Sequence, residues 1–254
     1  TPQGAHMWLR GLPQTVDVGR PQDIDESSTE VYNHPVKAYT DGGAAHPADP
    51  RMRRSGWGIW VKEGHPLNRY GVVPGPEQTA GRAELYAAVK VLERTSSDVF
   101  MIIDNKACVH NMMALMDGRL IPHGKHADLH RRAINAYELG PPRTLRVKWV
   151  PSHMEDVDIL KGTISREDKA GNGEADKLAT RGVELHKVPK HQEEEVARQD
   201  SPGGRAVAND AESHGKYARQ GSGQEEGGEA AARGSSEEVS GPEDWAAWGA
   251  QFRR

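Results

Sequence analysis

Four acidic residues and one histidine stand where the sequence pattern places the ends of strands or the body of helices. They are Asp41, Glu84, Asp104, Asp176 and His153. Carboxylate oxygens are hard ligands, and they favour Mg²⁺ or Mn²⁺ over zinc or copper. Two such ions about 3.5–4 Å apart can activate a water molecule and stabilise the leaving oxygen of a phosphodiester. Without a cation, four clustered carboxylates would repel one another. The set therefore predicts a two-metal site for Mg²⁺, with Mn²⁺ as a substitute.

Asp41 follows Val36–Thr40, in which small or apolar residues alternate with larger ones. This alternation predicts a β-strand that ends at Asp41. Gly42 and Gly43 predict a sharp turn there, and they leave room for another element to approach the backbone. Asp-Gly is also the commonest signal of a hairpin turn, so this stretch alone does not separate a metal ligand from a turn residue.

Four further strands are predicted, over residues 56–61, 67–73, 99–103 and 145–150. Short turns join the first three strands of the chain, which predicts an antiparallel meander. The strand over 99–103 is a continuous apolar run, typical of a strand buried on both faces, and Asp104 follows it directly. Because open sheets bind ligands beyond the carboxyl ends of parallel strands, Asp104 is a strong candidate for a functional residue.

Glu84 lies on an amphipathic helix that we expect to begin after the N-cap Thr79. An acidic residue beside an apolar face is more often a solvated flank than a ligand. His153 follows the last strand, and Asp176 lies on the first turns of a final helix over about 172–186. Two other helices are predicted, over residues 106–117 and 127–139.

Five motifs, taken together and in this order, resemble the type 1 ribonuclease H domain. They are Tyr39-Thr40-Asp41-Gly42-Gly43, Gln78-Thr79-Ala80-Gly81-Arg82-Ala83-Glu84-Leu85, Ile102-Ile103-Asp104-Asn105, Val150-Pro151-Ser152-His153 and Gly171-Asn172-Gly173-Glu174-Ala175-Asp176-Lys177-Leu178-Ala179. The resemblance covers about Val36 to Leu185. It implies the α/β ribonuclease H-like fold, a five-stranded mixed sheet of three antiparallel strands followed by two parallel ones, flanked by helices. With all five motifs present, the hairpin-turn interpretation of Asp41 loses most of its support.

The resemblance implies an endonuclease that cuts the RNA strand of an RNA–DNA hybrid with two Mg²⁺ ions. It assigns metal binding to Asp41, Glu84, Asp104 and Asp176, and proton transfer or product release to His153. RNA would be distinguished from DNA through contacts to the 2′-hydroxyl groups. The alternative is a catalytically inactive relative that binds nucleic acid or a protein partner. All four carboxylates are present, which favours the enzyme.

Three features depart from the family pattern. Ala80-Gly81 replaces polar amides that could hydrogen-bond to sugar hydroxyls, so we expect weaker hybrid binding or strand discrimination. The segment from His153 to Asp176 is longer than in compact cellular members and resembles the version in retroelement polyproteins. Two alternatives follow: His153 is more mobile than in those members, or it is not the working histidine. Residues 117–125 are too few for the basic protrusion of some members, so hybrid binding would depend on other basic residues or on a partner domain.

Composition predicts three regions in the chain. Residues 1–35 are polar and rich in proline, which indicates a leader with little structure, and residues 36–189 form the expected ribonuclease H domain. Residues 190–254 lack apolar periodicity and are rich in Gly, Ser and Glu, which predicts a disordered acidic tail. Lys and Arg outnumber Asp and Glu in the central region, which is compatible with a nucleic-acid partner.

The remaining signals concern partners and location. Trp245, Trp248 and Phe252 have helical spacing and could form a short helix that binds a protein partner. The single cysteine, Cys108, and the absence of a membrane span or signal peptide predict an intracellular protein, cytoplasmic or nuclear and not secreted. We expect a monomer. A chain that begins at Thr1 and has no room for a polymerase suggests a retroelement fragment. Four histidines, at positions 110, 123, 126 and 130, receive no role from the sequence.

Overall fold

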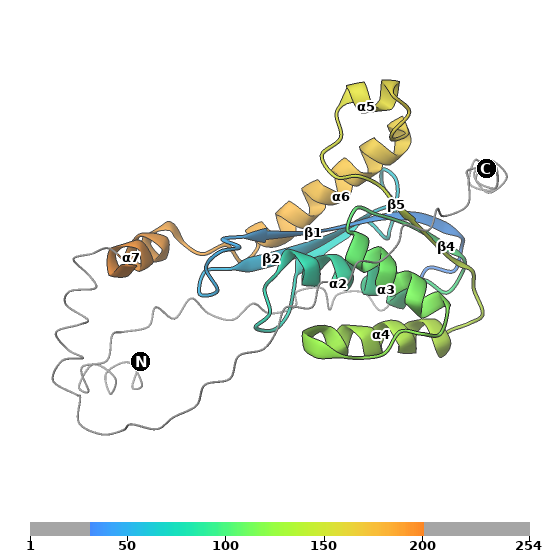
Figure 1. Cartoon of the computed structure of the whole chain (residues 1–254), viewed down its shortest axis with the longest axis horizontal. Coiled ribbons are helices and arrows are strands. Elements are labelled where there is room, and N and C mark those ends of the chain that lie inside the picture. Colours follow the sequence, from blue (N-terminus) through green and yellow to red (C-terminus); the bar gives the residue numbers. More distant parts are fainter. Residues whose placement is uncertain (1–30, 201–254) are drawn as a thin grey trace, which may run out of the picture. The chain divides into compact units, whose positions relative to one another are not determined.

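The computed structural model describes residues 31–200, and Figure 1 shows how its elements are arranged. Five strands form one sheet in the order β3-β2-β1-β4-β5. The strands are β1 (Val36–Ala45), β2 (Arg54–Trp60), β3 (Arg69–Val72), β4 (Val99–Ile103) and β5 (Leu145–Trp149). The pairs β1–β2 and β2–β3 are antiparallel, whereas β1–β4 and β4–β5 are parallel. The predicted five-stranded mixed sheet is therefore confirmed.

The helices cover both faces of this sheet (Figure 1). The helices of the domain are α2 (Ala80–Arg94), α3 (Lys106–Met116), the 3₁₀ helix η2 (Gly124–His126), α4 (Ala127–Glu138), α5 (Asp156–Leu160) and α6 (Arg166–Glu184). A further helix, α7 (Lys190–Asp200), follows them in the chain. Helices α2, α3 and α4 lie on one face, and α6 crosses the other. Across residues 31–200, we find no helix with the length and apolar character needed to cross a membrane.

The hydrophobic core lies between the sheet and α2, α3 and α4. Val36 and Ala38 contribute from β1, Trp57 from β2 and Met101 from β4, and all four are at most 2% exposed. Helix α2 begins as predicted, because the hydroxyl of Thr79 accepts a hydrogen bond from a backbone N–H of the first turn. The apolar stripe of α2 then packs on β1 and β2.

The predicted turn after Asp41 is wrong. Strand β1 continues to Ala45, and Gly42 and Gly43 pair with Trp57 and Gly56 on β2. A β-carbon on Gly42 would lie 2.1 Å from the backbone nitrogen of Glu84. The glycine is needed because α2 approaches the strand here, and the hairpin-turn interpretation of Asp41 is also wrong.

The start of the last helix of the predicted domain also differs from expectation. Helix α6 begins at Arg166 rather than at Asn172, because the Ser165 hydroxyl caps it by accepting a hydrogen bond from the backbone N–H of Asp168. Asp176 consequently lies in the middle of α6 and not on its first turns. Gly171 is in the helix interior because the ring of Tyr39 occupies the space of a β-carbon, 2.4 Å away.

Parts of the two predicted flanking regions have defined structure. Tyr32, in the predicted leader, forms a parallel bridge with Thr95, and residues 190–200, in the predicted tail, form α7. The rest of the leader and tail lies outside the described residues, as do Trp245, Trp248 and Phe252 of the expected partner-binding helix.

Two glycines of α6 test the close packing of this helix on β1. Gly171→Ala should lower the free energy of unfolding by roughly 1–3 kcal/mol, because the new methyl group would overlap the Tyr39 ring. Gly173→Ala is the matched control, since no atom lies within 4 Å of its β-carbon position, and it should raise that free energy by about 0.5–1 kcal/mol. Urea unfolding of both variants measures the difference. Equal effects would contradict the packing argument.

Candidate active site

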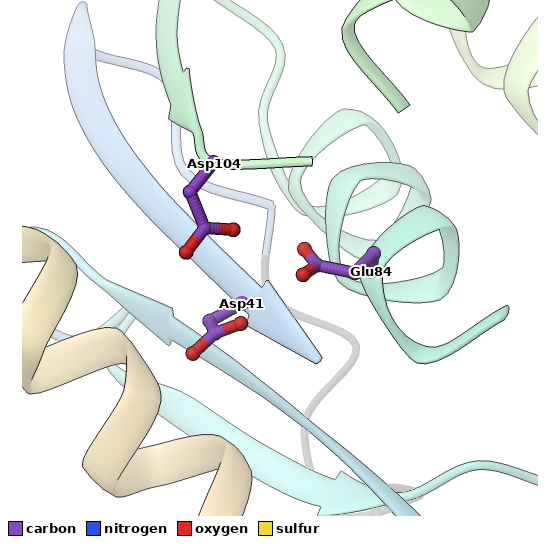
Figure 2. Close-up of side chains that lie close together, drawn as sticks. All are labelled: Asp41, Glu84 and Asp104. Carbon is purple, nitrogen blue, oxygen red and sulfur yellow. The ribbon is translucent and has the colours of Figure 1, made fainter. Parts of the chain in front are cut away.

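Three carboxylates from three different elements converge at one edge of the sheet. Asp41 comes from β1, Glu84 from α2 and Asp104 from the residue after β4. One oxygen of each side chain lies within 4.8 Å of an oxygen of the other two, and Figure 2 shows the three groups pointing toward one another. Of all His, Cys, Asp and Glu side chains in residues 31–200, these are the one group of three placed so closely.

Backbone geometry explains this convergence. In the parallel pairing of β1 with β4, Thr40 lies opposite Ile103, which places the next residues, Asp41 and Asp104, beside each other. Helix α2 brings Glu84 to the same point because Gly42 has no side chain to hold the helix away. The strand register and one glycine are therefore sufficient to assemble the three carboxylates.

Burial makes the negative charge of this cluster costly. Asp41 and Glu84 are 8% and 6% exposed. Burial, together with the Asp104 carboxylate, raises the pKa of Asp41 to about 7, although the Gly42 N–H donates to its Oδ1 over 2.6 Å. Burial and the charges of Asp41 and Asp104 also hold the pKa of Glu84 well above its usual range. A cation at this point would remove the repulsion.

One atom of the cluster fits such a cation directly. Glu84 Oε2 is buried and has no hydrogen-bond partner among residues 31–200. A buried carboxylate oxygen without a partner is costly unless a ligand satisfies it. The donor set consists of oxygen atoms alone, as Mg²⁺ and Mn²⁺ prefer.

Asp176 and His153 line the same cavity as the three carboxylates, but they do not join the close group. The cavity has a volume of about 480 Å³. Asp176 is exposed on α6, and its charge contributes to the raised pKa of Asp41. His153 is exposed in the loop after β5, where its backbone has a φ of 54°. The structure thus brings three of the five predicted residues into contact range and places the other two around them.

Asn172 is a site residue that was not singled out from the sequence. Its Nδ2 donates a hydrogen bond to Asp104 Oδ2 over 3.1 Å, and its Oδ1 is buried without a partner among the described residues. Trp149 Nε1 donates to the backbone carbonyl of Asp104 over 2.9 Å. Together these two residues orient Asp104. Asn172 stands four residues before Asp176, a helical spacing that could have drawn attention to it.

A buried ion-pair network, also missed from the sequence, fixes the start of α6. Asp168 is 3% exposed, and its carboxylate accepts hydrogen bonds from Lys37 and Lys148, each over 2.8 Å, and from the Tyr39 hydroxyl over 3.1 Å. Burial alone would raise the pKa of Asp168, but the bonds from Lys148 and Lys37 lower it to about 2. The network ties the first turn of α6 to β1 and β5, and so positions the helix that carries Asn172 and Asp176.

Known proteins resemble the chain over this region. A model of the RNase H family matches residues 33–184. Among solved structures, the RNase H domain of PFV is 21% identical, with 59% of this chain and 94% of that chain covered and a TM-score of 0.40. RNase H1 of Halobacterium salinarum NRC-1 is 20% identical, with 60% and 99% covered and a TM-score of 0.38. LC11-RNase H1, solved with an RNA/DNA hybrid, is 18% identical, with 59% and 97% covered and a TM-score of 0.41. No curated protein matches the chain.

Removing one charge from the carboxylate cluster should stabilise the metal-free protein at high pH. The pKa of Asp41 is raised from 3.8 to about 7, so the folded state disfavours its ionised form, and stability is lost as the pH rises between these values. With a chelator present to remove metal ions, Asp41→Asn should therefore increase the free energy of unfolding by roughly 1–3 kcal/mol at pH 8. At pH 4 the same substitution should change this free energy little.

Thermal unfolding at both pH values measures this difference. Glu63→Gln is the control, because Glu63 is exposed in the turn after β2. Destabilisation by Asp41→Asn at pH 8 would show that repulsion in the cluster is already relieved by other means.

Proposed function

The chain belongs to the RNase H family, and from this we propose that it is an endonuclease that hydrolyses the RNA strand of RNA–DNA hybrids. The observation that carries the proposal is the convergence of Asp41, Glu84 and Asp104, with one buried Glu84 oxygen left without a partner among the described residues. A protein that only bound nucleic acid would have no use for this cluster of buried, mutually repelling carboxylates.

We assign metal binding to the three converging carboxylates and to Asp176. Bound Mg²⁺, or Mn²⁺ in its place, would supply a more acidic water and would offset the charge that develops on the leaving oxygen. Asp41 interacts electrostatically with all three of the other acidic groups, which makes it the central member of the set. Asn172 and Trp149 hold Asp104 in place through hydrogen bonds to its carboxylate and to its backbone carbonyl.

His153 is assigned a role in proton transfer or product release. Its side chain is exposed and lines the catalytic cavity, so it can approach and leave a bound substrate. Imidazole is the side chain that most readily exchanges protons near neutral pH. The loop also contains Pro151, which stiffens the chain between β5 and His153.

The proposed substrate is a hybrid duplex because the family relative LC11-RNase H1 was solved with one, and because this region of the chain is net basic. Basic residues offset the phosphate charges of either strand, whereas contacts to the 2′-hydroxyl group would select RNA. A second function, hybrid binding without catalysis, would leave the carboxylates without a purpose, and the first experiment separates the two.

Cleavage of a labelled RNA–DNA hybrid by the full chain in Mg²⁺ tests the proposal, with double-stranded RNA and double-stranded DNA as comparison substrates. Only the hybrid should be cut. Asp104→Asn should lower the rate about a hundredfold or more, because metal binding supplies several kcal/mol of transition-state stabilisation. Asp117→Asn, an exposed carboxylate just after α3, is the matched control and should leave the rate unchanged. Hybrid binding in a gel shift without any cutting would favour the inactive relative.

His153→Asn tests the role of the histidine without straining its backbone. Asn adopts positive φ more readily than most residues, so it should accept the φ of 54° at this position. We expect turnover to fall about a hundredfold, with hybrid affinity unchanged, because only proton transfer or product release is impaired. Single-turnover and steady-state cleavage rates distinguish these two steps. Full activity of the variant would remove His153 from the mechanism.

A further inference from the structure

Three histidines gather at the start of α4, away from any role in the proposed cleavage reaction. His130 lies on α4, His126 is the N-cap of that helix, and His123 is the N-cap of η2. The spacing, His-x₂-His-x₃-His, places the second and third rings four residues apart on a helical segment. Residues with this separation lie on the same side of a helix.

The ring nitrogens of two of these histidines lack partners. His130 is 4% exposed, and both of its nitrogens are buried without a hydrogen-bond partner among residues 31–200. His126 Nδ1 is likewise buried without a hydrogen-bond partner among residues 31–200. A buried imidazole nitrogen without a hydrogen-bond partner destabilises the folded state, so three of them in neighbouring rings require an explanation.

The ring of His123 lies close enough to the ring of His130 for both to bind one ligand. The ring centroids of His123 and His130 are 5.3 Å apart, with the planes tilted by 43°. Two imidazoles bound to one Zn²⁺ through nitrogens at about 2.0–2.1 Å have ring centres roughly 5 Å apart. His123 Nδ1 lies 2.7 Å from the carbonyl of Ile121, so this nitrogen must donate, and Nε2 is left to accept. Such a bond to the second nitrogen is the usual way in which a metal-binding histidine is oriented.

The electrostatic surroundings of His126 and His130 disfavour protonation of their rings. Burial is the main reason why the pKa values of His126 and His130 are lowered, and the nearby cations Arg82 and Lys125 act in the same direction on His126. Arg82 is paired with Asp128 over 2.5 Å, and Lys125 lies 3.9 Å from Glu77. A neutral imidazole, which keeps a lone pair on one nitrogen, is the form that binds metal ions.

We propose that His123, His126 and His130 bind one Zn²⁺ or a similar borderline divalent cation, at a site distinct from the carboxylate cluster. Imidazole ligands suit such cations, whereas the carboxylates suit Mg²⁺. The three rings do not yet bring their nitrogens within 4.8 Å of one another, so binding requires the exposed His123 ring and the half-buried His126 ring to turn toward His130. The bound ion would link the segment before η2 to α4 and satisfy the buried nitrogens.

Zn²⁺ titration of the full chain, in excess Mg²⁺ to occupy the carboxylates, tests this proposal. Calorimetry should show one equivalent of Zn²⁺ bound. Co²⁺ in place of Zn²⁺ should give the intense visible absorption of a tetrahedral site with nitrogen ligands. His123→Gln should weaken Zn²⁺ binding by about tenfold or more. Because His123 is exposed, this substitution should not affect folding. His130→Gln should give at least as large a loss if the variant folds.

His110→Gln is the matched control, since His110 is exposed on α3 and is not among the charges that act on His130. It should bind Zn²⁺ as the unmodified chain does. The proposal is overturned if no Zn²⁺ binds in the presence of Mg²⁺, if His123→Gln and His110→Gln bind it equally, or if Co²⁺ shows only oxygen ligands. None of these outcomes depends on whether the protein cuts hybrids.

Discussion

Asp41, Glu84 and Asp104 repel one another, and the rest of the described structure must be stable enough to keep them together. Two of these carboxylates, Asp41 and Glu84, are almost fully buried, and besides burial the nearby Asp104 carboxylate raises the pKa of both. The fold does not separate them, because the β1–β4 register and the absence of a side chain at Gly42 determine where they lie. The hydrophobic core between the sheet and α2 stabilises this arrangement, since moving Glu84 away would require the whole helix to move.

The same domain holds a carboxylate with a shifted pKa of the opposite sign. Asp168, on α6, lies between two lysines and keeps its charge at any ordinary pH, whereas Asp41 is charged only near neutrality and above. The paired charge at Asp168 attaches α6, whereas the uncompensated charge at Asp41 makes its position compatible with a cation. Two acidic residues in one domain thus differ in purpose because one has basic neighbours and the other has acidic ones.

The sequence predicted the sheet and most helix positions because hydrophobic periodicity is a local property. It failed where a local signal had a distant cause. Gly42-Gly43 was interpreted as a turn, although Gly42 permits the close approach of α2. The last helix was predicted to begin at Asn172, although Gly171 already lies inside it, where the Tyr39 ring leaves no room for a side chain. The five predicted site residues do surround one cavity, but the partners of Asp104 and Asp168 come from other elements. The missing partners of His130 could not be known before the helices were packed.

The pairing of β1 with β4 has a consequence for attempts to engineer the proposed metal site. Asp41 lies on β1 and Asp104 directly follows β4, and these strands pair in parallel up to Thr40 and Ile103. The spacing of the two backbones is therefore set by the inter-strand distance of about 4.8 Å, whatever the side chains are. Glu84 belongs to a helix and has no such restriction. To accommodate a larger ion, the position of helix α2, which carries Glu84, would have to change, because the spacing between the backbones of the two aspartates is fixed.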